Sequence, residues 1–107
     1  MRALTALADP TRRQIVEMLA GGERTAGDIV RQFDVSAPAI SQHLKVLKEA
    51  RLVTVRADAQ RRIYALDAAG IDEIDAWLSG IRRFWRGRLD ALERELNAAR
   101  KSEGDKS

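Results

Sequence analysis

The chain has 107 residues, of which 45% are apolar and 33% are charged, a balance typical of a single globular domain. It contains no cysteine, which excludes disulfide bonds, a thiol nucleophile and cysteine-ligated zinc or iron–sulfur sites. The formal net charge of +3 is too small to indicate a partner by itself, so the distribution of charge along the chain has to be considered.

Two short helices are expected at the N-terminus. Leu4 and Leu7 predict a first helix that ends before Asp9, because the residue before a proline avoids the helical conformation. Asp9 can then cap a second helix, with Pro10 in its first position. Gly21-Gly22 is expected to end it.

A third helix is predicted from Thr25 to Gln32, with the spacing of a capping box between Thr25 and Asp28. Asp34-Val35 is the expected turn, and Ser36 can cap a fourth helix that begins near Ala37. A short helix, a tight turn and a second helix together predict a helix-turn-helix.

The fourth helix has two different faces. At about 100° per residue, one face gathers an apolar stripe. It consists of Ala37, Ile40, Leu44 and Leu47. The opposite face carries Pro38 and three side chains that can form hydrogen bonds, Ser41, Gln42 and Lys45, which suits entry into the major groove of DNA. The alternative is an ordinary amphipathic helix with a solvated polar face.

A β-hairpin is predicted after the fourth helix, because the apolar period becomes strand-like from Leu52 to Arg56 and again from Arg61 to Leu66. Asp58–Gln60 would form the loop. The hairpin could be a two-stranded cap on a helical core or a wing that contacts DNA, and Arg61 and Arg62 near its tip favour the wing.

Positive charge is concentrated in the middle of the chain. Between Ser36 and Arg62 there are six basic residues and two acidic ones, a local net charge of +4, whereas the segments on either side are close to balanced. This excess coincides with the fourth helix and the hairpin, as expected for a surface that follows a phosphate backbone.

The strongest periodicity in the chain lies between Ile71 and Leu96, where apolar residues recur at steps of three and four. A straight helix over 68–99, capped by Asp67, would be roughly 48 Å long, so it should bend or break at Ser79-Gly80 or Gly87, or extend beyond its domain. We expect a second copy of the chain to cover its apolar stripe. The predicted dimer interface consists of Leu4, Leu7, Leu78, Ile81, Trp85, Leu89, Leu92 and Leu96.

The alternative is that the final helix folds back on its own hairpin. In either case we expect one domain over 1–99, which includes the C-terminal dimerisation region at about 68–99, and a flexible polar tail at 100–107.

Three segments together carry a family resemblance: ALADPTRRQIVEML, VSAPAISQHLKVLKEARLV and RRIYAL. They resemble the winged helix-turn-helix repressors of the ArsR/SmtB family. The resemblance implies a fold that is mainly α with a β-hairpin wing, N- and C-terminal helices that form a dimer interface, and a homodimeric repressor of transcription. By position, Ser36, Ser41, Gln42, His43 and Lys45 match the DNA-facing helix, and Arg61 and Arg62 match the wing. For His43 a structural or phosphate-binding role stays open beside base recognition.

The chain departs from the metal-sensing members of that family. Thr25 and Gly27 occupy the positions of the metal-binding cysteines, and His43 is the only histidine, so neither the thiolate site nor the histidine–carboxylate site of the last helix can form. We therefore expect no metal and no cofactor. A small-molecule effector is possible and stays unidentified.

The sequence favours a DNA-binding repressor over two alternatives. A winged-helix adaptor for protein interaction or dimerisation, without specific DNA binding, would be compatible with the aromatic residues Trp77, Phe84 and Trp85. An enzyme is not expected, because no glycine-rich phosphate loop or catalytic constellation is present. Because no segment has the roughly 18 apolar residues of a membrane helix and the N-terminus lacks a signal-peptide pattern, we expect a cytoplasmic protein without membrane contact.

Overall fold

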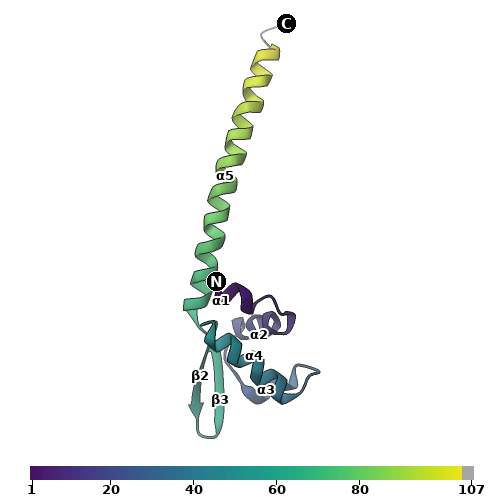
Figure 1. Ribbon diagram of the computed structural model, residues 1–107, viewed down its shortest axis with the longest axis vertical. Coiled ribbons are helices and arrows are strands. Elements are labelled where there is room, and N and C mark those ends of the chain that lie inside the picture. Colours follow the sequence, from purple (N-terminus) through teal and green to yellow (C-terminus); the bar gives the residue numbers. More distant parts are fainter. Residues whose placement is uncertain (105–107) are drawn as a thin grey trace. The chain divides into compact units, whose positions relative to one another are not determined.

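The computed structural model describes residues 1–104 (Figure 1). The chain is mainly helical with a small antiparallel sheet, which confirms the predicted winged helix-turn-helix fold. It divides into two units, Met1–Ile74 and the part from Asp75 onward. In chain order the elements are α1 (Arg2–Ala6), α2 (Pro10–Ala20), β1 (Arg24–Thr25), α3 (Ala26–Arg31), α4 (Ala37–Glu49), β2 (Val53–Asp58), β3 (Arg61–Leu66) and α5 (Ala68–Gly104).

The predicted helix caps are confirmed. The Asp9 carboxylate accepts a hydrogen bond from the backbone N–H of Arg12 at 3.1 Å, and the Ser36 hydroxyl accepts one from Ala39 at 3.2 Å. Thr25 and Asp28 form both hydrogen bonds of a capping box. Such caps satisfy N–H groups that the first turn of a helix leaves without partners, so the starts of α2, α3 and α4 are set locally.

The sheet has the strand order β1-β3-β2 and is antiparallel throughout. The predicted hairpin is confirmed, with Val53 opposite Leu66 and Asp58 opposite Arg61. Asp58 therefore belongs to β2 rather than to the loop. The third strand, β1, was not predicted, because two residues are too few for a period to be visible.

The core of the first unit lies where α4 packs against α1, α2, α3 and β2. Ile40, Leu44 and Leu47 of α4 are buried as predicted, whereas Ala37 is exposed, so its assignment to the buried stripe was wrong. Ala37 occupies the first position of the helix, beyond the end of the buried stripe. The other large, fully buried side chains are Ile15, Ile29, Leu52 and Val53.

The last helix, α5, is continuous from Ala68 to Gly104 (Figure 1). Of the expected alternatives, two consecutive helices are therefore not found, and both Ser79-Gly80 and Gly87 lie within the helix. The Asp67 carboxylate accepts a hydrogen bond from the backbone N–H of Ala69 at 2.9 Å, as expected for a cap. The predicted tail begins inside α5, and its residues 105–107 lie outside the described residues.

Candidate nucleic-acid interface

The outer face of α4 presents the side chains that the sequence assigned to it. Ser41, Gln42 and Lys45 are exposed, one helical turn apart or adjacent, and their inward-facing neighbours Ile40 and Leu44 are buried. Burial of the inner face fixes the rotation of the helix about its axis, so these polar groups must face solvent.

A groove of about 320 Å³ lies between α4 and the β2–β3 hairpin. Its lining combines Ser41, Gln42, Leu44, Lys45 and Lys48 of α4 with Val55, Arg62 and Tyr64 of the hairpin. The groove therefore brings Arg62 together with Ser41, Gln42 and Lys45, as the combination of a recognition helix and a wing requires. Tyr64 is almost fully buried and supports this contact from the hairpin side.

The charge of this groove is positive without an opposing acid. Its charged lining residues are Lys45, Lys48 and Arg62. Lys48 is one of the six basic residues between Ser36 and Arg62, but the sequence did not single it out for DNA binding. Lys48 follows Lys45 by three residues, and residues three apart on a helix lie on the same side, so this spacing could have indicated its place in the groove.

Arg61 does not share this groove with Arg62. Its guanidinium is paired with Asp58 at 2.9 Å, and both side chains are largely exposed. Arg61 instead lines a separate hollow, together with Arg62, Gln60 and the start of α3. Arg62 therefore lines both hollows, whereas Arg61 lines only the second.

His43 lies at the contact between α2 and α4. It is half-buried, and its Nδ1 is 3.5 Å from Nη1 of Arg12, whose Nε donates to the carbonyl oxygen of Ala6 at 2.6 Å. His43 is absent from the residues that line the groove between α4 and the hairpin. A backbone hydrogen bond from Arg12 lowers the pKa of Asp9 below its usual range, partial burial opposes this shift, and electrostatic interaction with His43 and Arg12 adds to it.

The residues predicted for a dimer interface differ in exposure. Leu4 in α1 and Leu7 directly after it are half-buried, and Leu7 packs against the core. In α5, Leu78 and Ile81 are partly buried. The remaining four are more than half exposed: Trp85 at 55%, Leu89 at 58%, Leu92 at 51% and Leu96 at 51%. A stripe of large apolar side chains with this exposure is a feature of association surfaces.

Two further observations limit the chemistry of the described residues. Within residues 1–104, no three side chains of the types His, Asp and Glu are grouped closely enough to hold a metal ion. In the same part of the chain, no helix has an apolar stretch long enough for a membrane span.

Comparison with known proteins gives consistent matches. Residues 9–55 match the family model described as "Bacterial regulatory protein, arsR family". The chain is 47% identical over 104 residues to the HTH-type transcriptional regulator Rv2034 of Mycobacterium tuberculosis, a match that covers 97% of this chain and 91% of that protein. It is 40% identical over 73 residues to the transcriptional repressor SdpR of Bacillus subtilis, covering 68% and 81% respectively. An ArsR-like transcriptional regulator from Rhodococcus sp. RHA1 has a similar structure, with a TM-score of 0.72, 27% identity and coverage of 87% and 88%.

Proposed function

The chain belongs to the arsR family of bacterial regulatory proteins and is a DNA-binding transcriptional repressor rather than an enzyme, and from this premise we propose that it binds an inverted-repeat operator as a homodimer. The groove between α4 and the hairpin carries this proposal. It combines hydrogen-bonding groups for base edges with three cations for phosphates and contains no acidic side chain.

Within the groove we assign two kinds of contact. The Gln42 amide can form two hydrogen bonds with an adenine edge, and the Ser41 hydroxyl can donate to or accept from several bases. Lys45, Lys48 and Arg62 contact phosphates, which position the protein without reading sequence. Ser36 and Arg61 do not line the groove, and we assign them to contacts with the DNA backbone beside it.

His43 is assigned to positioning. Its ring is turned toward Arg12 and is half-buried, so it supports α4 from the α2 side rather than reading bases. The contact with Arg12 supports a structural role over the other two roles considered for this residue.

The dimer is proposed to form through α5. Its stripe of Trp85, Leu89, Leu92 and Leu96 is exposed and apolar, as expected for a surface that a partner covers. Four basic residues of the helix form one segment between two acidic ones, while Arg94, Arg100 and Lys101 lie outside this basic segment. The three segments are Asp72, Glu73 and Asp75, then Arg82, Arg83, Arg86 and Arg88, and then Asp90, Glu93 and Glu95.

This charge distribution favours one orientation of the pair. A parallel pair in register would place the basic segments of the two copies against each other, which is unfavourable for like charges. An antiparallel pair brings the basic segment of one copy to an acidic segment of the other. Both orientations have a twofold axis and match the symmetry of an inverted-repeat operator, so the charges decide between them.

A footprint on the DNA upstream of the gene that encodes this protein would test the proposal. We expect protection of an inverted repeat with half-sites about 34 Å apart, or roughly 10 bp from centre to centre, or a multiple of this spacing. Affinity should fall on the order of 10³- to 10⁵-fold between about 50 and 200 mM salt, because several phosphates are contacted per dimer. A protein that acts only as an adaptor through Trp77, Phe84 and Trp85 would show neither symmetric protection nor this salt dependence.

A further inference from the structure

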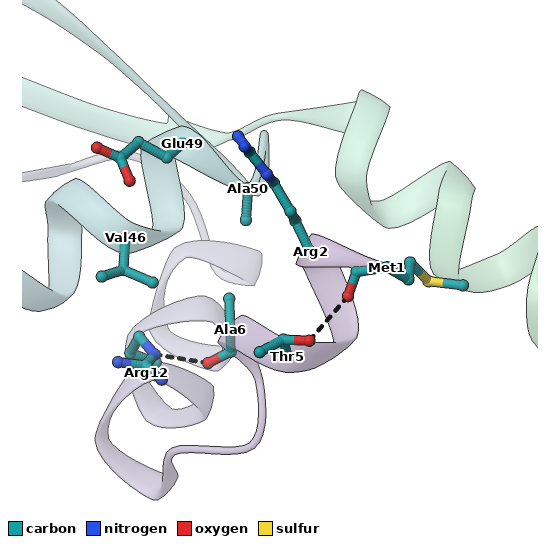
Figure 2. Close-up of a pocket in the computed structure, with 8 residues that line it drawn as sticks. All are labelled: Met1, Arg2, Thr5, Ala6, Arg12, Val46, Glu49 and Ala50. Carbon is teal, nitrogen blue, oxygen red and sulfur yellow. Dashed lines mark hydrogen bonds between the residues drawn. The ribbon is translucent and has the colours of Figure 1, made fainter.

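A second pocket contacts α4 outside the DNA-binding groove. It has a volume of about 430 Å³, within the range of small-molecule sites. The lining residues come from α1, α2, α4 and the positions beside them (Figure 2): Met1, Arg2, Thr5, Ala6, Arg12, Val46, Glu49 and Ala50. All of them belong to the first unit, and the function proposed above does not use the pocket.

The chemistry of the lining is mixed. Ala6, Val46 and Ala50 provide apolar surface, while Arg2 and Arg12 provide two positive charges and Glu49 one negative charge. In Figure 2 the guanidinium of Arg2 and the carboxylate of Glu49 are drawn toward one end of the pocket, and Arg12 toward the other. Arg2 and Glu49 are exposed and opposite in sign, so together they add no net side-chain charge. Among the charged side chains of the lining this leaves Arg12.

Arg12 is suited to bind an anion. It is half-buried, and among residues 1–104 its guanidinium forms no ion pair. One of its five N–H donors is used by the Ala6 carbonyl oxygen, and a second nitrogen lies 3.5 Å from His43. Donors are therefore left for a carboxylate, which pairs with a guanidinium more strongly than a neutral acceptor does.

We propose that this pocket binds a small organic monocarboxylate with a hydrocarbon body. The carboxylate pairs with Arg12, and the body packs on Ala6, Val46 and Ala50. A single negative charge is preferred because Glu49 would repel a second carboxylate.

The ligand is coupled to DNA binding through Arg12. This side chain connects α2 to the end of α1 through the Ala6 carbonyl and approaches His43, the residue after Gln42 in α4. A carboxylate on the remaining donors draws the guanidinium away from Ala6 and His43, which changes the support of α4. Binding of the ligand therefore weakens DNA binding, and DNA weakens ligand binding by the same factor. This coupling rests on the proposed function, whereas the pocket and its ligand do not.

Calorimetric titration of the DNA-free protein tests the pocket with butyrate, hexanoate and octanoate as probes. We expect one hexanoate or octanoate per chain, and binding at least tenfold weaker for hexanamide, which lacks the charge, and for adipate, which carries a second one. The absence of binding for all three monocarboxylates, or equal binding of hexanoate and hexanamide, would overturn the proposal.

Three variants locate the site. Arg12→Gln should weaken hexanoate binding at least tenfold, whereas Arg13→Gln, an exposed neighbour outside the lining, should leave it unchanged. Thr5→Trp should block the pocket without touching Arg12, and it decides the question if Arg12→Gln does not fold. Unchanged hexanoate binding by folded Thr5→Trp would place the ligand elsewhere and refute the assignment.

The coupling is measured separately by titrating operator duplex with and without saturating hexanoate. An affinity loss within the range of about 5- to 150-fold is expected for allosteric coupling. An unchanged affinity would refute the coupling. Failure of the ligand-free protein to bind the duplex would count against the proposed function and would leave the pocket result standing.

Discussion

The backbone N–H of Gly70 donates a hydrogen bond of 2.7 Å to the carbonyl oxygen of Arg51. A Cβ added at Gly70 would lie 2.5 Å from that oxygen, and 2.8 Å from the carbonyl carbon, so only glycine permits this approach. Arg51 has a positive φ of 58° in the turn after α4. The contact therefore joins the first turn of α5 to the turn that follows α4.

Gly70→Ala should destabilise the protein by about 1 to 3 kcal/mol, because the backbone must move apart to admit the methyl group. Gly87→Ala is the matched control. No atom lies within 4 Å of a Cβ at Gly87, so the same change should stabilise α5 by roughly 0.5 to 1 kcal/mol. Urea denaturation measures both values, and a Gly70→Ala protein as stable as the native one would show that the close approach is not required.

Gln42→Ala should reduce sequence preference at one position of each half-site by about 1 to 3 kcal/mol, because the lost amide contacts a base edge. Affinity for random duplex should change little. Competition binding with operator variants that differ at single positions measures this preference. Equal losses for operator and random duplex would instead assign Gln42 to phosphate.

Arg62→Ala should weaken binding to every duplex and reduce the salt dependence by about one counterion per chain, because a phosphate contact is lost. Arg61→Ala should have a smaller effect, since Arg61 lies outside the groove and is already paired with Asp58. Fluorescence anisotropy at several salt concentrations compares the two variants. A larger loss for Arg61→Ala would place the phosphates on the other side of the hairpin.

Replacing both Leu89 and Leu92 by Asp should prevent dimer formation, because each charge would be buried against the partner at a cost of several kcal/mol. The double replacement Asn97→Asp, Ala98→Asp adds the same charge outside the stripe and should stay dimeric. Analytical ultracentrifugation gives the oligomeric state, and operator affinity should be lost only in the first variant. If the first variant remains a dimer with normal affinity, the interface lies elsewhere, with α1 the next candidate.

Acid should destabilise the protein through its capping carboxylates. Hydrogen bonds from the Thr25 side chain and backbone lower the pKa of Asp28, and the Arg12 backbone N–H lowers that of Asp9, both from an ordinary value of 3.8. A carboxyl group whose pKa is lower in the folded state than in the unfolded state stabilises the folded protein. This stabilisation is present at pH values above the ordinary pKa of 3.8 and is lost as the pH falls through the pKa of the folded state.

The double variant Asp9→Asn, Asp28→Asn should therefore lose less stability than the native protein between about pH 5 and pH 2, because asparagine caps without titrating. Thermal unfolding at a series of pH values measures the difference. Parallel pH profiles for the two proteins would show that these carboxylates do not contribute to the acid response.

Local order along the chain could be predicted from the sequence, and the caps illustrate why. Asp9, Thr25 and Ser36 act on N–H groups three residues away, and the buried positions of α4 repeat every three or four residues. Both relations are contained in a short window, so residue type and spacing are sufficient to determine them. The alternating strands of the hairpin, and the exclusion of thiolate metal sites by the lack of cysteine, are equally local.

The tertiary structure alone decided which residues share a surface. Arg62 joins Gln42 in the groove while its neighbour Arg61 does not, and this follows from how the hairpin packs on α4. His43 and Arg12 are 31 residues apart in the sequence but lie close together in the structure. The strand β1 forms because it pairs with β3, and not because its own two residues predict a strand. Such contacts depend on the packing of elements that are distant along the chain, which the periodicity of any one segment does not contain.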